Sequence, residues 1–140
     1  MIIDTTYLLP LSHIGIDTDL LKAIDDNKIK LNFDEITISL ISIFELQAKA
    51  AKLKVPTNFT AEAIDVIGTV FRIKPFYDPE IIKTSYTLLK QISDYIDCII
   101  VATATVLNED LITEDSKIIA NKKFIKDKFG INVMNYKDLL

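Results

Sequence analysis

The sequence predicts an α/β fold in which a mostly parallel sheet is covered by helices on both faces. Short β-branched, apolar segments alternate with longer segments of helical periodicity along the 140 residues. Hydrophobic residues make up 49% of the chain and charged residues 26%, a composition that can bury a core without disulfides. The chain has no repeat, linker or low-complexity run, so we expect one domain over residues 1–140.

The expected strands are short, and β-branched or apolar residues dominate them. The segment ITISL, at residues 36–40, is the clearest example. In chain order, strands are expected at residues 1–4, 36–40, 73–76, 111–113 and 131–134.

The expected helices lie between these strands, and capping or helix-stopping residues mark their ends. Thr60 and Asp78 are expected N-caps, and Pro56 and Gly130 follow the ends of two helices. In chain order, helices are expected at residues 17–27, 42–54, 60–72, 79–92, 95–108 and 116–128.

Composition excludes several classes of protein. A net charge of −4 argues against a protein that holds nucleic acid by bulk positive charge. The lysines at 49, 52 and 54 form either a solvated helix face or a rim that contacts a nucleic-acid backbone. Cys98 is the only cysteine, which fits a reducing cytoplasm, where we expect the protein to act. We expect neither a signal peptide nor a membrane span.

Four carboxylates are predicted to converge on one edge of the sheet. In parallel α/β sheets, ligands bind outside the carboxyl ends of the strands. Asp4 ends the first strand, and Asp115 stands two residues after the strand at 111–113. Glu45 lies in the first turns of the helix that follows the second strand, and Asp97 lies in the first turn of its own helix. All four side chains can therefore face the same edge.

Helix capping is a structural explanation for each acid taken alone. Asp4 and Asp115 can each cap the helix that follows. Glu45 fits a capping box that starts at Ser42. Asp97 would be favoured by the dipole of its helix. Four converging carboxylates, however, repel one another, and a Mg²⁺ or Mn²⁺ ion would relieve that repulsion.

Four segments carry a family resemblance. They are IIDTTYLLPL at 2–11, ISIFELQAKA at 41–50, DCIIVATA at 97–104 and LITED at 111–115. With these segments, spread over nearly the whole chain, the sequence resembles PIN-domain ribonucleases, and among them the toxins of VapBC toxin–antitoxin pairs. Two positions depart from the family pattern, because many relatives carry a basic residue at the place of Glu114 and an acid at that of Lys117.

The resemblance implies a PIN-like three-layer sandwich around a parallel five-stranded sheet. It implies hydrolysis of RNA phosphodiester bonds with Mg²⁺ or Mn²⁺, an antitoxin partner and a homodimer. We expect the dimer interface among apolar residues of the helices at 17–27 and 60–92. The implied metal-binding and catalytic acids are Asp4, Glu45, Asp97 and Asp115, with supporting hydroxyls at Thr5 or Thr6 and at Thr113.

Other functions stay open at this point. A housekeeping RNA-processing nuclease without an antitoxin would have the same fold, and a non-catalytic interaction module would use the four acids only as caps. A receiver-type signalling domain needs an acidic pair just after the first strand, and an aspartyl-phosphate phosphatase needs an acid where Thr6 stands. His13 is expected to be a loop residue without a catalytic role, and Cys98 a packing residue.

Overall fold

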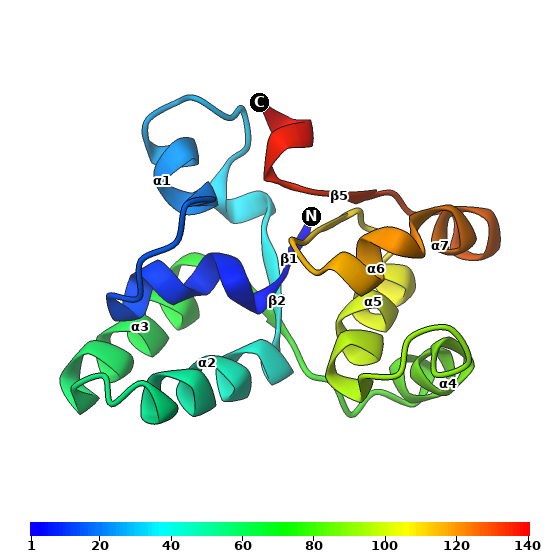
Figure 1. The fold of residues 1–140 in the computed structure, drawn as a ribbon, viewed down its shortest axis with the longest axis horizontal. Helices are drawn as coiled ribbons and strands as arrows, with labels where there is room; N and C mark the ends of the chain where they lie inside the picture. The colour runs from blue at the N-terminus through cyan, green and yellow to red at the C-terminus, as the bar shows by residue number, and fades with distance from the viewer.

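The computed structural model describes residues 1–140 and contains one five-stranded sheet (Figure 1). Every neighbouring pair of strands is parallel, in the order β3-β2-β1-β4-β5. The prediction of a parallel α/β sheet is therefore confirmed, and the N-terminal strand β1 lies at its centre. The strands are β1 (Ile2–Ile3), β2 (Thr37–Ser39), β3 (Arg72–Lys74), β4 (Leu111–Ile112) and β5 (Val133–Met134).

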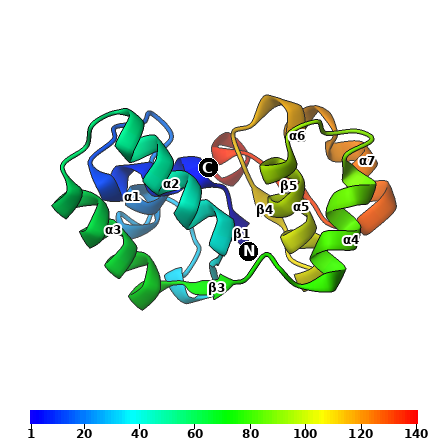
Figure 2. The same ribbon diagram turned by 90° about the horizontal axis from the view of Figure 1, so that it is seen from below.

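Helices cover both faces of the sheet, as the two views show (Figures 1 and 2). The helices α1, α2 and α3 lie on one side, and α4, α5, α6 and α7 lie on the other. The α-helices are α1 (Leu20–Asp25), α2 (Leu40–Lys52), α3 (Thr57–Val70), α4 (Pro79–Leu88), α5 (Tyr95–Leu107), α6 (Ser116–Ala120) and α7 (Lys122–Phe129). Three 3₁₀ helices complete the chain, namely η1 (Thr5–Ser12), η2 (Phe33–Glu35) and η3 (Tyr136–Leu139).

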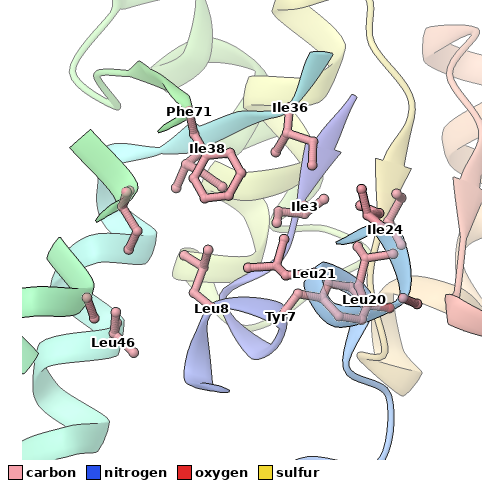
Figure 3. Close-up of a cluster of buried hydrophobic side chains, with 14 of the residues drawn as sticks. Ile3, Tyr7, Leu8, Leu20, Leu21, Ile24, Ile36, Ile38, Leu46 and Phe71 are labelled. Atoms are coloured by element: carbon pink, nitrogen blue, oxygen red, sulfur yellow. The ribbon is translucent and has the colours of Figure 1, made fainter. Parts of the chain in front are cut away.

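Successive strand residues face opposite sides of the sheet and so enter two separate hydrophobic cores. Ile3 and Ile112 join the core shown in Figure 3, under η1, α1 and α3. Ile2 and Leu111 join the second core, which contains residues of α4, α5, α6 and α7. The two-residue strands β1 and β4 thus suffice to connect both layers, because each of them contributes one fully buried residue to each core.

Helix α5 is buried around most of its circumference. Residues 98–104 are all buried, which is typical of a helix enclosed on every side. Asp94 caps it, with Oδ1 accepting hydrogen bonds from the amides of Ile96 and Asp97 at 2.9 and 3.3 Å. The first turn of α5 is therefore fixed both by packing and by its cap. None of the helices combines the length and the apolar character needed to cross a bilayer.

Three expectations about the helices are wrong. Thr60 lies inside α3, which begins at Thr57, directly after Pro56, without a side-chain cap. The helix expected at 116–128 is interrupted at Asn121, whose side-chain amide donates to the carbonyl of Lys117 (2.8 Å) and ends α6. The apolar residues of the helix expected at 17–27 are buried in the first core, so this helix offers no apolar dimer interface.

The packing of α5 leads to a stability prediction. Ile100→Ala in α5 removes a side chain that is 0% exposed, and we expect the free energy of unfolding to fall by about 2–5 kcal/mol. Ile82→Ala in α4, where the isoleucine is 40% exposed, is the matched control and should cost less than half as much. Urea denaturation followed by circular dichroism measures both. Equal losses for the two variants would contradict the enclosed position of α5.

Candidate active site

Asp4 stands directly after the central strand β1 and is 6% exposed. The Thr113 hydroxyl donates to its Oδ2 (2.6 Å), and the Thr5 amide donates to its Oδ1 (2.7 Å). The second bond makes Asp4 the N-cap of η1, as the sequence predicted. Because β1 and β4 are parallel neighbours, Asp4 and Thr113 leave the sheet side by side, although 109 positions separate them.

Asp115 is held at the same edge by the turn between β4 and α6. Its amide donates to the Thr113 hydroxyl oxygen (3.0 Å), so this one hydroxyl links Asp4 to Asp115. Its Oδ1 accepts from the amides of Lys117 and Ile118, both at 2.9 Å, and caps α6, as the sequence predicted. Its Oδ2 has no hydrogen-bonding partner in the structure. Capping therefore fixes the orientation of Asp115 while one carboxylate oxygen stays available.

Glu45 and Asp97 are not explained by capping. Helix α2 begins after Ser39, so Glu45 lies in its second turn and the capping box expected from Ser42 is wrong. Asp94, not Asp97, caps α5, and Asp97 only shares the favourable field of the helix dipole. Neither carboxylate accepts a hydrogen bond from a protein group or forms an ion pair. Two of the four acids thus have no local structural partner.

The four acids line one polar cavity of about 360 Å³ that has no hydrophobic lining residue. The three supporting threonines occupy different positions. Thr6 lines the cavity, whereas Thr5 and Thr113 are buried beside it. The hydroxyl of Thr5 is buried without a hydrogen-bonding partner. The full lining is Asp4, Thr6, Glu45, Lys49, Asp97, Glu114, Asp115 and Ser116.

Three lining residues were not predicted as site residues from the sequence. Glu114 and Ser116 flank Asp115, and Lys49 follows Glu45 by one helical turn on the same face of α2. The four-residue spacing of Glu45 and Lys49 is the signal that could have identified the lysine.

Burial and mutual repulsion disturb the acids. Loss of solvent raises the pKa of Asp97 to about 7, and the negative charges of Asp115, Asp94, Asp4 and Glu45 add to that rise. Burial also raises the pKa of Asp4, although the hydrogen bonds from Thr113 and Thr5 oppose the rise. The cavity therefore disfavours the ionised form of Asp97 and Asp4. A bound cation would relieve this repulsion between carboxylates.

The donor set fits a hard divalent cation by its chemistry, since all the acids offer oxygen and Mg²⁺ and Mn²⁺ prefer oxygen ligands. No three His, Cys, Asp or Glu side chains are arranged so that they already enclose a metal position. Mg²⁺ does not need such a cage, because it usually keeps several waters and is bound by one or two carboxylates together with substrate phosphates. Glu45, Asp97 and Oδ2 of Asp115 are the oxygen donors without competing bonds.

The histidine and the cysteine have no part in this cavity. His13 ends η1 in a left-handed conformation (φ 64°), and its ring stacks on Phe59 at 4.0 Å. Cys98 is fully buried, and its thiol donates to the carbonyl of Ile92 (3.2 Å). Burial raises the pKa of this thiol to about 11, which agrees with the packing role predicted from the sequence.

Several solved structures have the same fold as this chain. A toxin–antitoxin complex from Klebsiella pneumoniae contains a chain that is 24% identical, with a TM-score of 0.65 over 85% of this chain and 89% of that one. FitAcB from Neisseria gonorrhoeae gives 20% identity and a TM-score of 0.68 over 99% of both chains. VapBC2 from Rickettsia felis, bound to a promoter DNA fragment, gives 21% and 0.65 over 96% of both.

The similarity to these solved structures shows the fold of the chain. The family is shown by comparison of the sequence with a family model. Comparison with curated protein sequences gives no match. The family model for the PIN domain matches residues 1–124. This range includes the threonine and acidic residues at the carboxyl ends of β1 and β4, together with Glu45 of α2 and Asp97 of α5. With the parallel sheet and the acidic cavity at its carboxyl edge, the chain belongs to the PIN domain family.

Proposed function

We propose that residues 1–140 form one nuclease domain that hydrolyses RNA phosphodiester bonds with Mg²⁺ or Mn²⁺. The observation that carries this proposal is the polar cavity in which Asp4, Glu45, Asp97 and Asp115 meet from four different elements of the fold. A structural role as caps accounts for Asp4 and Asp115 only. The other two acids remain as unpartnered oxygen donors, which supports a binding function over a purely structural one.

The surroundings of each cavity residue indicate its role in the proposed reaction. Glu45 and Asp97 present free carboxylates, and Asp115 adds Oδ2, so these three would hold the cation. Asp4 is fixed by two hydrogen bonds and sets the charge at the floor of the site. A divalent cation bound there supplies activation of a water and neutralises charge at the phosphate. Lys49, the one cationic residue of the cavity lining, is placed to attract a non-bridging phosphate oxygen.

We further propose that the protein is the toxin of a toxin–antitoxin pair and acts in the cytoplasm as a homodimer. The likeness of fold to a chain of a toxin–antitoxin complex supports the antitoxin partner. For the dimer, we propose a surface after residue 57, where several large apolar side chains are exposed. These include Val66, Val70, Ile82, Tyr86 and Leu89.

Cleavage of a structured RNA in the presence of Mn²⁺ or Mg²⁺ tests the nuclease. We expect the wild type to cut, EDTA to stop it, and Asp97→Asn to lower kcat by at least ~100-fold, because charge stabilisation by a metal contributes several kcal/mol. Asp127→Asn removes an exposed carboxylate of α7 outside the cavity and should cut like the wild type. Equal cutting by the wild type and Asp97→Asn would show a contaminating nuclease and refute the proposal.

The raised pKa of Asp97 predicts how stability depends on pH in the metal-free protein. Folding favours the protonated carboxyl, whose pKa rises from 3.8 to about 7, so this contribution is complete below about pH 4 and is lost as the pH rises through about 7. Asp97→Asn should therefore gain stability relative to the wild type between about pH 4 and pH 8, whereas Asp127→Asn should not.

Urea denaturation at several pH values measures this difference. Saturating Mn²⁺ should restore stability to the wild type at about pH 8, because the ion binds only the folded, ionised site. A difference between wild type and Asp97→Asn that does not change with pH would contradict the repulsion argument.

Lys49 gives a separate prediction about substrate binding. We expect Lys49→Gln to raise KM for RNA about two- to fivefold with little change in kcat, because an exposed ammonium contributes up to about 1 kcal/mol to an ionic contact. Lys52→Gln, three residues later on α2 and outside the cavity, is the matched control. Steady-state cleavage at low salt compares the two. An equal effect of both variants would assign the loss to net charge, not to a phosphate contact.

A further inference from the structure

Glu114 lines the acidic cavity, yet one of its carboxylate oxygens is engaged on the side of the protein interior. Its Oε1 accepts a hydrogen bond from the Tyr7 hydroxyl (2.7 Å) and another from the Tyr136 amide (2.8 Å). A carboxylate oxygen with two donors is oriented by them and is a poor candidate for coordination to a cation through that atom. The acidic residue at the position where the family pattern has a base is therefore tied into the scaffold.

The first partner belongs to the same segment as Asp4. Tyr7 lies in η1, is 0% exposed, and its amide donates to the Asp4 carbonyl at 3.2 Å. Burial raises the pKa of Tyr7, as does the hydrogen bond to Glu114, so the phenol keeps the proton that it donates. Consecutive residues of the β4–α6 turn thus hold one short segment at two points, since Thr113 binds Asp4 and Glu114 binds Tyr7.

The second partner comes from the end of the chain. Tyr136 is the first residue of η3, which follows the edge strand β5 and lies beyond residues 1–124, the part that matches the family model. In the ladder just before it, the Thr113 amide donates to the Met134 carbonyl (2.9 Å). The C-terminal segment therefore reaches the β4–α6 turn through the backbone at Thr113 and through the side chain at Glu114.

We propose that Glu114 is a positioning residue that joins η1, the β4–α6 turn and the C-terminal helix η3, and so fixes Asp115 relative to Asp4. The proposal rests on the proposed metal-dependent nuclease only for its effect on cation binding. The linkage itself is a property of the metal-free protein. Glu114 acts through hydrogen-bond acceptance, so its charge is not what the site requires.

The variants separate these roles. Tyr7→Phe removes one donor and keeps the buried ring, with Tyr86→Phe, an exposed tyrosine, as its control. Tyr136→Pro removes the other donor at the first position of a helix, where proline is tolerated, and Tyr136→Ala keeps the amide but loses the same ring. Glu114→Gln keeps an acceptor oxygen without charge, whereas Glu114→Ala removes the acceptor.

Two measurements on the full chain test the proposal. Amide hydrogen exchange in metal-free protein reports whether the Asp115 amide, bonded to the Thr113 hydroxyl, stays protected. Calorimetry reports binding of Mn²⁺ alone. We expect Tyr7→Phe, Tyr136→Pro and Glu114→Ala to speed exchange at Asp115 by on the order of 10-fold and to weaken Mn²⁺ binding roughly 10-fold. Glu114→Gln, Tyr136→Ala and Tyr86→Phe should stay within about threefold of the wild type.

The outcomes are distinguishable. If the three deletion variants exchange faster at Asp115 while the wild type binds no Mn²⁺, the linkage is supported and the proposed effect of Glu114 on cation binding is refuted. The nuclease is then judged by RNA cleavage alone. Unchanged exchange in all three donor or acceptor deletions would overturn the positioning role, whether or not Mn²⁺ binds. If Glu114→Gln weakens Mn²⁺ binding as much as Glu114→Ala does while exchange stays slow, the charge of Glu114 matters and the proposal is wrong.

Discussion

The buried carboxylate of Asp4 constrains the whole site. An ionised carboxylate away from water is costly unless hydrogen bonds compensate it. The Thr5 amide supplies one bond, and it is available because Asp4 ends a strand and begins a 3₁₀ helix. The Thr113 hydroxyl supplies the other, and it is available only because β4 is the parallel neighbour of β1. The order of strands in the sheet therefore supplies one of the two hydrogen bonds that favour the charged form of Asp4 against the effect of burial, which raises its pKa.

Capping and ligand binding are compatible uses of the same carboxylate. Asp115 caps α6 through Oδ1 and leaves Oδ2 free, so the helix fixes the rotamer of a donor that faces the cavity. Site residues need this kind of support, because a ligand that moves by about 1 Å loses much of its effect. Asp97 obtains its support differently, from a helix that is buried over residues 98–104 directly behind it. Hydrogen bonds thus hold the carboxylate of Asp115 in place, whereas core packing of α5 holds that of Asp97.

The parallel sheet, the approximate positions of its five strands and the meeting of the four acids could be predicted from the sequence, because strand and helix periodicity are local and the rule for parallel sheets is general. The order of the strands in the sheet was not predicted, because it depends on contacts between segments far apart in the chain. The details that failed depend on the tertiary structure. The capping box at Ser42 is a correct local pattern, but α2 begins at Leu40, so the pattern lies inside the helix. The break at Asn121 could not be predicted, because no proline or glycine marks it in the sequence. Glu114 could not be assigned, because its partners Tyr7 and Tyr136 are 107 and 22 positions away.

The negative charge of the cavity affects the approach of RNA in the proposed reaction, as well as its hydrolysis. Five carboxylates and one ammonium line the metal-free site, and the whole chain carries a net charge of −4. A phosphodiester backbone approaching such a surface is repelled at the distance where screening by salt is weak, within about 10 Å. Lys49 alone does not offset five acids. In the proposed reaction, a bound cation would therefore lower the repulsion of the RNA as well as assist its hydrolysis. Glu114 adds to the negative charge of the cavity, although one of its oxygens is engaged by Tyr7 and Tyr136.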